Sequence, residues 1–222
     1  MPSEFLHVRR LQLYTVPPFQ GSGVSVRRAI TAAVPDEPLL HNHADGPSQP
    51  LVRYSCQAGV VELVAIGAAI ALAGTLAERL KRLRVGQNWF VVKAVEVRDE
   101  KLPFGECAES LPYVFDTPWL ALNEDNHRRF LGTVEGERKQ LLQRILAGNL
   151  LSLSKAVGHN VSERLVPELE WWEPVPCYHK GVSLVGFRAA FRVNFHVPPG
   201  LGLGKLVAKG FGRVGSPGRE GG

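Results

Sequence analysis

The sequence predicts an α+β fold made of two consecutive units of strands and helices. First, the chain has 222 residues and is 45% hydrophobic, which is enough for one large core or for two cores of about 100 residues each. Second, segments with apolar residues at every second position alternate with segments whose apolar residues recur every third or fourth position. The 23 glycines and 16 prolines predict many turns between these segments.

The first half of the chain predicts elements in the order β-α-β-β-α-β, which is the ferredoxin-like arrangement. Pro35 and Pro38 end the first helix, and Ala58 and Gly59 separate two strands as a hairpin turn does. The expected elements are a strand over residues 5–14, a helix from 22 or 25 to about 33, strands over 51–57 and 60–66, a helix from about 68 to 83, and a strand over 89–97.

A linker is expected over residues 101–112, because this segment contains Pro103, Gly105 and Pro112. It would separate an N-terminal domain of residues 1–102 from a C-terminal domain of residues 103–222. The second half is expected to be a more degenerate unit of the same type. Its elements are a strand around residues 113–120, a helical stretch from 124 to about 157 broken near Gly132 and Gly136, and strands over 164–172 and 182–197.

The last of these strands has two distinct faces. One face carries Arg188, Arg192, Asn194 and His196, with Ala190 among them. The other face is apolar and consists of Phe187, Ala189, Phe191, Val193, Phe195 and Val197. The pattern predicts a half-buried strand whose basic face either binds a polyanion or is an ordinary solvated surface.

The basic charge of the chain is concentrated near its end. The chain has 26 Lys and Arg against 21 Asp and Glu, a net charge of +5. Residues 177–222 contain 7 basic residues and 1 acidic residue, so this segment carries +6 and the preceding 176 residues carry −1. A local excess of this kind is typical of an electrostatic footprint for a polyanion.

Within this basic region, residues 200–214 are rich in glycine, and Lys205, Lys209 and Arg213 lie among the glycines at a spacing of four. Glycine lets backbone N–H groups approach a ligand closely, and the cations suit an RNA backbone. The segment does not match a nucleotide-triphosphate loop, because Leu206 follows Lys205 and Pro199 stands where a glycine is required.

Two histidines, His41 and His43, lie in the loop that follows the first helix. Such a pair can supply a general base and a general acid, as RNA transesterification requires: one imidazole takes the 2′-OH proton and the other protonates the leaving 5′-oxygen. A metal site is one alternative, although only Asp45 stands nearby as a further ligand. Two solvated loop histidines are another. Pro38 and Gly46 flank the pair and would allow the bent loop that a joint role needs.

The other chemical signals in the sequence are weak. Three scattered cysteines without a Cys-x-x-Cys pair predict neither a disulfide framework nor a zinc site. We expect no cofactor and no metal. No charged and then apolar leader opens the chain, and residues 60–77 fit a strand and a helix better than a membrane span, so a cytoplasmic protein is expected.

Blocks distributed along the chain resemble the CRISPR-associated endoribonucleases of the RAMP superfamily, which cut precursor repeat RNA into guide RNAs. The b-type subfamily is the most similar, and the resemblance spans about residues 5–214. The blocks are Leu-Val-Arg-Tyr at 51–54, Thr-Pro-Trp-Leu-Ala-Leu-Asn at 117–123, Gly-Asn-Leu-Leu-Ser-Leu-Ser-Lys-Ala-Val-Gly at 148–158, Gly-Val-Ser-Leu-Val-Gly-Phe at 181–187, and Val-Asn-Phe at 193–195 leading into Gly-Leu-Gly-Lys at 202–205 and Lys-Gly-Phe-Gly-Arg at 209–213.

The resemblance implies a tandem ferredoxin-like fold of the RRM/RAMP type. It also implies metal-independent cleavage that leaves a 5′-OH and a 2′,3′-cyclic phosphate. His41 and His43 occupy the position of the family's catalytic histidines. The family's glycine-rich loop contacts RNA, and some relatives have a lysine soon after the histidine, which is missing here. Counting the cations that could replace that lysine, the expected RNA-binding residues are Arg27, Arg28, Arg53, Gly202, Gly204, Lys205, Lys209, Gly210, Gly212 and Arg213.

Two other classes of protein stay open at this point. A non-catalytic RAMP subunit that holds guide RNA in an interference complex would have no need of the histidine pair. An RNA-binding module of the RRM type needs aromatic side chains on exposed strand faces, whereas Phe187, Phe191 and Phe195 alternate as a core face. The expected partners are CRISPR repeat RNA and other subunits of an interference complex, without a membrane, for a chain that is either a monomer or a homodimer.

Overall fold

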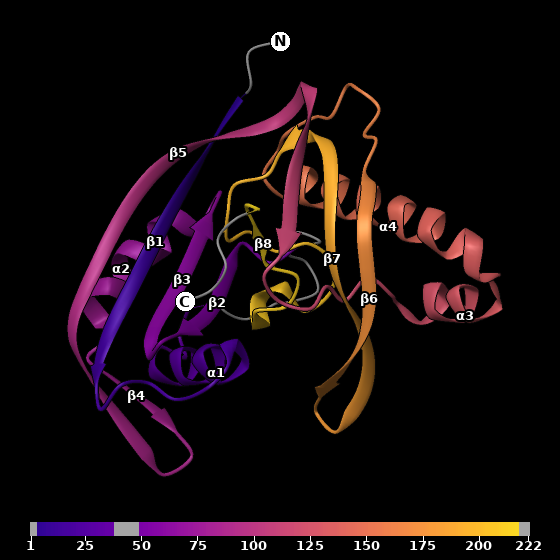
Figure 1. Cartoon of the computed structure of the whole chain (residues 1–222). Helices are drawn as coiled ribbons and strands as arrows, with labels where there is room; N and C mark the ends of the chain where they lie inside the picture. The colour runs from indigo at the N-terminus through magenta and orange to yellow at the C-terminus, as the bar shows by residue number, and fades with distance from the viewer. Residues whose placement is uncertain (1–3, 38–48, 218–222) are drawn as a thin grey trace. The chain divides into compact units, whose positions relative to one another are not determined.

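The computed structural model describes residues 4–37 and 49–217, which fold as two compact units (Figure 1). The N-terminal unit consists of Leu6–Leu102 and Ala208–Gly210. The C-terminal unit consists of Met1–Phe5, Pro103–Val207 and Phe211–Gly222. Each unit combines α-helices with antiparallel strands, so the predicted α+β class is confirmed.

The N-terminal unit has the predicted β-α-β-β-α-β order, with one short additional strand. The hydrogen-bonded strands follow each other as β2-β3-β1-β5, and β4 pairs with the start of β5. The elements are β1 (Glu4–Val16), α1 (Gly23–Ala33), β2 (Val52–Gln57), β3 (Val60–Ile66), α2 (Ala69–Arg79), β4 (Arg82–Val85) and the first part of β5 (Asn88–Phe115).

The core of this unit lies between the sheet and the two helices. Leu11 of β1 and Leu63 of β3 are fully buried and directly paired across the strands. Val26 and Ile30 of α1 and Leu76 of α2 pack into the same cluster, because their spacing places them on one helix face. Each fully buried aliphatic side chain of this kind stabilises a fold by about 1.5–3 kcal/mol.

Two predictions for this half are wrong. The second helix ends at Arg79 and not near residue 83, because Arg82–Val85 instead pairs with β5 across a turn at Gly86, whose φ is +60°. Residues 101–112 are not an irregular linker, because they lie inside β5, which runs for 28 residues, although the two units do divide within them, between Leu102 and Pro103. Gly105 has a φ of +108°, and the pairing of β5 with its neighbour shifts register between Glu106 and Leu111. The glycine and prolines therefore mark an irregularity within one strand.

The C-terminal unit begins with the end of β5, and its sheet has the order β5-β7-β6, with β8 paired to β5. The helical stretch breaks between Gly132 and Gly136 as predicted, since α3 ends at Gly132 and α4 begins at Glu135. Of the last two strands, β6 starts at Glu168 and not near 164. The elements are α3 (Glu124–Gly132), α4 (Glu135–Ala156), β6 (Glu168–His179), β7 (Val182–His196), the 3₁₀ turn η2 (Val207–Lys209) and β8 (Val214–Gly215).

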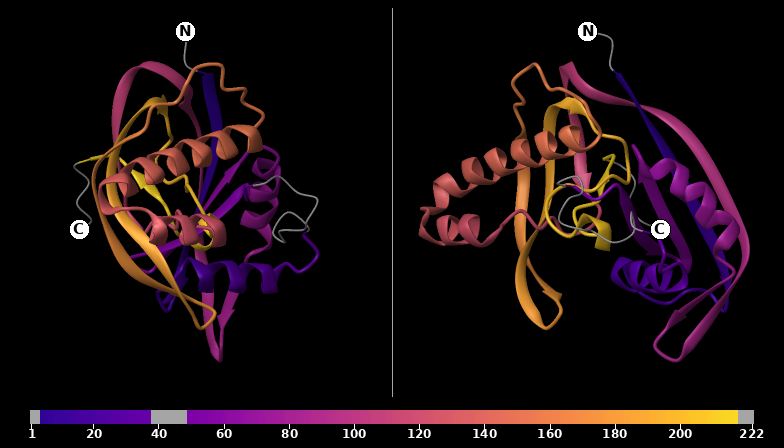
Figure 2. Two further views of the ribbon diagram at one scale, coloured as in Figure 1. Left: turned by 90° about the vertical axis from the view of Figure 1, so that its right-hand side faces the viewer. Right: turned by 180° about the vertical axis from the view of Figure 1, so that it is seen from behind.

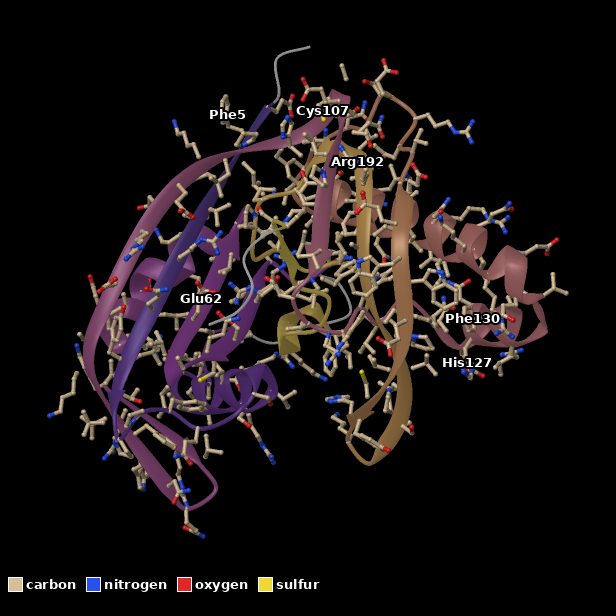
Figure 3. The ribbon with its side chains drawn as sticks, in the orientation of Figure 1. Phe5, Glu62, Cys107, His127, Phe130 and Arg192 are labelled. Atoms are coloured by element: carbon tan, nitrogen blue, oxygen red, sulfur yellow. The ribbon has the colours of Figure 1, made fainter. Side chains whose placement is uncertain are left out.

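Strand β7 supplies the centre of the C-terminal core. The alternation predicted for its second half is confirmed, since Phe187, Phe191 and Phe195 are fully buried whereas Arg188 is exposed. Helices α3 and α4 lie on one side of the β6–β7 hairpin (Figure 2). Phe130 of α3, labelled in Figure 3, meets the ring of Phe187 edge-on at 5.5 Å between centroids. The glycine-rich segment occupies the place in the order where a complete β-α-β-β-α-β unit has its second helix.

Within residues 4–37 and 49–217, no helix is both long enough and apolar enough to span a bilayer.

Candidate functional site

The predicted catalytic residues His41 and His43 lie outside the described residues, and their roles stay predictions. The described residues just before them, Asp36 and Glu37, bond to α2. Arg79 of α2 donates through Nη2 to Asp36 Oδ1 at 2.6 Å and through Nη1 to Glu37 Oε1 at 2.9 Å. The hydrogen bond that Arg79 donates to Asp36 lowers the pKa of this carboxyl group. The end of the described chain before residue 38 is therefore bonded to the second helix of the N-terminal unit.

Arg53 is the third residue of the block at 51–54, and it is a buried cation on β2. Its side chain is 4% exposed, and none of its three guanidinium nitrogens has a hydrogen-bond partner in the described part of the chain. Burial lowers its pKa to about 10, so it remains charged at neutral pH. The buried Oε1 of Gln49 is likewise unpartnered there. Unpaired buried polar groups are costly, and a charged one in particular favours an anionic ligand.

Lys209 lies beside the start of α1, because the tip of the glycine-rich segment belongs to the N-terminal unit. A Cβ on Gly23 would lie 2.7 Å from the carbonyl oxygen of Lys209 and would also collide with the carbonyl oxygen of Tyr54. Burial raises the pKa of Tyr54, and the nearby charge of Arg27 opposes that rise. The structure thus brings Arg27, Lys209 and the strand that carries Arg53 into one unit. Arg28 is exposed on α1.

The predicted RNA-binding glycines have demanding backbone positions. Gly204 has a φ of +91°, and a Cβ there would lie 2.8 Å from both the Leu120 carbonyl oxygen and the Trp119 indole nitrogen. Gly212 has a φ of +62°, and a Cβ there would collide with the carbonyl oxygen of Leu203. Gly202 and Gly210 are also closely approached, within 2.8 and 3.2 Å of neighbouring atoms. These contacts explain the glycines as a packing requirement, and their binding of RNA stays a prediction.

The three cations of the glycine-rich segment have different surroundings. Lys205 is exposed in the C-terminal unit, where its backbone N–H donates to Leu120 at 3.0 Å. Arg213 places Nε 3.7 Å from Asp116 Oδ2, and its backbone N–H donates to the Thr117 hydroxyl at 2.9 Å. Lys205 and Arg213 belong to the C-terminal unit, whereas Lys209 belongs to the N-terminal unit.

Two cavities open beside Lys205 in the C-terminal unit. One, of about 760 Å³, is mainly apolar, and Leu122, Leu184, Leu206 and His127 are among the residues that line it. The other, of about 420 Å³, is polar and lies between α3, α4 and Gly204–Lys205. The sequence did not point to Arg129 of α3 and Arg144 of α4, the cations that line this cavity. The available signal was that Asn123, Gly148 and Asn149, which line it, belong to blocks that carry the family resemblance.

A cluster of His159, Glu4 and Glu106 joins the start of β1 to the loop after α4. His159 shares hydrogen bonds of 2.6 Å with Glu4 through Nδ1 and with Glu106 through Nε2. Burial lowers the pKa of His159, but the two carboxylates outweigh burial and the pKa is raised. Burial raises the pKa of Glu106, whereas hydrogen bonds from His159 and from the N–H groups of Ser162 and Glu163 bring it to about 2. The ring also packs over Gly105, so this group is a tie within the C-terminal unit.

No group of three or more His, Cys, Asp and Glu side chains in the described ranges is arranged to hold a metal ion. His41, His43 and Asp45, which the sequence offers as an alternative metal site, lie outside those ranges.

Known structures confirm the tandem ferredoxin-like fold of the RAMP type. A crystal structure of Cas6b is 28% identical, with a TM-score of 0.85 over 96% of this chain and 99% of that one. A structure described as the CRISPR RNA processing endoribonuclease Cas6b is 26% identical, with a TM-score of 0.72 over 94% of this chain and 98% of that one.

Sequence comparison defines the family more closely. The family model of the Cas6b C-terminal domain matches residues 106–216, and the chain belongs to the Cas6b family. An uncharacterized protein of Methanocaldococcus jannaschii is 41% identical over 111 residues, which cover 50% of this chain and 76% of the relative.

Proposed function

We propose that this protein is an endoribonuclease that cleaves precursor CRISPR RNA within its repeats and releases guide RNAs. The observation that carries the proposal is the likeness, over 94% of the chain, to a structure described as a CRISPR RNA processing endoribonuclease, together with membership of the Cas6b family. Repeat RNA is accordingly the proposed partner. The basic residues of the glycine-rich segment and the unpaired guanidinium of Arg53 support a polyanionic substrate.

The proposed chemistry is a transesterification within the RNA. One imidazole of the pair His41 and His43 accepts the proton of the 2′-OH, whose oxygen attacks the adjacent phosphorus. The other imidazole donates a proton to the 5′-oxygen as its bond to phosphorus breaks. The products are a 2′,3′-cyclic phosphate and a 5′-OH, and the reaction requires no metal. Histidine suits both roles because its unperturbed pKa lies near neutrality.

A cation is also needed, because negative charge builds on the phosphoryl oxygens in the transition state. Arg53 is the proposed source of that charge. It lies on β2, soon after the segment of the two histidines, and it remains protonated although it is 4% exposed. Its unpartnered donors would be satisfied by the substrate phosphate. Arg27 on α1 is the second candidate.

The test is incubation with the cognate repeat transcript in excess EDTA, with product length and end groups determined. We expect one cut in each repeat, with a 5′-OH on one product and a 2′,3′-cyclic phosphate on the other. A substrate with 2′-deoxyribose at the scissile nucleotide should bind and stay intact. Activity that EDTA abolishes and Mg²⁺ restores would contradict the imidazole mechanism.

The same experiment separates this proposal from its main alternative, a non-catalytic subunit that holds guide RNA in an interference complex. Such a subunit would bind the repeat transcript and leave it uncut under every condition. A control with an unrelated RNA of equal length distinguishes recognition of the repeat from binding of any polyanion.

A further inference from the structure

The polar cavity of about 420 Å³ in the C-terminal unit has an unusual set of charges. Arg129 of α3, Arg144 of α4 and Lys205 of the glycine-rich segment all line it, and no Asp or Glu does. In the described part of the chain, none of these three side chains makes an ion pair or a hydrogen bond. By contrast, Arg128 pairs with carboxylates of its own helix and Arg213 faces Asp116. The cavity therefore gathers three cations whose charge is not compensated by the described residues.

Two carboxamides of the cavity are oriented by hydrogen bonds. Asn149 Oδ1 accepts from the indole N–H of the buried Trp119 at 2.9 Å. Asn123 Oδ1 accepts from the backbone N–H of Asn126 at 2.7 Å. Because these bonds occupy the oxygens, the NH₂ groups are left to donate. Donors and cations together select a ligand rich in acceptor oxygens and negative charge.

Helix α4 presents a glycine, Gly148, on the face that lines the cavity. Leu141, Arg144, Ile145, Gly148 and Asn149 follow one another on that face at helical spacing. A Cβ on Gly148 would meet no atom within 4 Å. The volume falls in the range of small-molecule sites, which is about 300–1,000 Å³, and so it can take a nucleotide.

We propose that this cavity binds the sugar–phosphate backbone of the RNA, as a second contact site in addition to the one that cleaves. The inference rests on the proposed function. The neighbouring apolar cavity supports RNA over a small inorganic anion, because Asn123 and Lys205 line both cavities. A nucleic acid presents phosphates and flat, weakly polar bases side by side, which matches a cationic cavity that adjoins an apolar one.

Binding of repeat RNA that carries 2′-deoxyribose at the scissile nucleotide tests the proposal, because it measures affinity without cleavage. Arg129→Ala combined with Arg144→Ala should weaken binding by about 10–100-fold at low salt. It should also flatten the slope of log K against log salt by about 1.4, the value for two single-strand phosphate contacts. Both side chains are exposed, so the melting temperature should not change.

Gly148→Glu provides an independent variant, since it places a carboxylate in the cavity without an obstructing neighbour. Gly136→Glu is the matched control: it makes the same substitution in the same helix, also in open space, but at a position that does not line the cavity. We expect Gly148→Glu to weaken binding at least tenfold and Gly136→Glu to bind like the wild type.

The outcomes separate the two proposals. If the wild type binds and cuts repeat RNA while the cavity variants bind it with unchanged affinity and salt slope, the cavity proposal is wrong and the proposed function stands. Equal losses in Gly148→Glu and Gly136→Glu would also overturn it, because the effect would then be one of net charge. If the wild type neither binds nor cuts repeat RNA, the proposed function fails, and this inference fails with it.

Discussion

Arg53 combines a cost to stability with a proposed role in catalysis. Its guanidinium is buried and unpartnered among the described residues, so replacing it with an apolar side chain removes a desolvated charge. We expect Arg53→Met to raise the free energy of unfolding by about 1 kcal/mol or more and to slow cleavage. Urea denaturation and single-turnover cleavage measure the two effects.

The exposed Arg28 on α1 is the control for stability, since Arg28→Met should change the free energy of unfolding by less than about 0.5 kcal/mol. If Arg53→Met destabilises the protein and cuts RNA at the wild-type rate, the side chain is a structural element and another cation serves the reaction.

The pairs made by His159 predict a pH dependence of stability. The folded pKa of His159 is raised above its ordinary 6.5, so its contribution is complete below pH 6.5 and is lost as the pH rises through the folded pKa. Glu106 has a folded pKa of about 2 against an ordinary 4.5, so its contribution is complete above pH 4.5 and is lost as the pH falls towards 2. The two contributions are complete together between about pH 4.5 and 6.5.

Melting temperatures of wild type and His159→Gln across pH 3–9 check this. The difference in melting temperature between wild type and variant should be largest inside that window. Above pH 6.5 the melting temperature of the variant should fall less steeply with pH than that of the wild type. His127→Gln is the control, because the structure shows no carboxylate bonded to the ring of His127 within the described ranges. Parallel curves for wild type and His159→Gln would show that the pairs add nothing to stability.

At the scale of elements, sequence patterns predict correctly those strands and helices whose structure depends on residues close in the sequence. The period-two pattern of β7 was read correctly because one face of that strand packs into the core along its whole second half. The extent of β5 was missed because its 28 residues are held by partners far away in the sequence. Pro103 and Gly105 are ordinary linker signals, and only the paired neighbour shows that they lie in a strand. The cationic cavity was missed for a similar reason, since Lys205 meets α3 and α4 only in the folded unit.

The glycine-rich segment is the element in which packing and binding compete as explanations. Gly212→Ala adds a Cβ against the Leu203 carbonyl oxygen at a φ of +62°. We expect it to destabilise the protein by about 1–3 kcal/mol, the usual cost of a strained backbone position. Lys205→Gln, at an exposed position, should leave the melting temperature unchanged and should flatten the salt slope of RNA binding by about 0.7.

Melting temperature and salt-dependent affinity measured on both variants separate the explanations. A Gly212→Ala variant that keeps its stability and loses RNA affinity would assign that glycine to close approach of RNA. A Lys205→Gln variant with an unchanged salt slope would remove this lysine from the binding surface.

At the scale of the whole molecule, the family match and the proposed chemistry lie in different halves of the sequence. The family model covers residues 106–216, whereas His41 and His43 precede that range. Arg79 bonds to Asp36 and Glu37, which precede the histidines in the sequence and belong to the N-terminal unit, and the cavity beside Lys205 belongs to the C-terminal unit. Substitution of the histidines should therefore act on cleavage, and substitution of the residues that line this cavity should act on binding.

His41→Ala and His43→Ala should each slow single-turnover cleavage of repeat RNA by about 10²–10⁴, the usual contribution of a positioned acid or base. Affinity for the substrate with 2′-deoxyribose at the scissile nucleotide should stay near that of the wild type, because neither substitution removes a contact of the C-terminal unit. His7→Ala is the control, since His7 is a half-exposed histidine of the same unit that is bonded to Asp99. Wild-type rates in both single variants would place the reaction elsewhere in the chain. An effect of only one histidine would show that the pair model is wrong and that the other histidine is a loop residue.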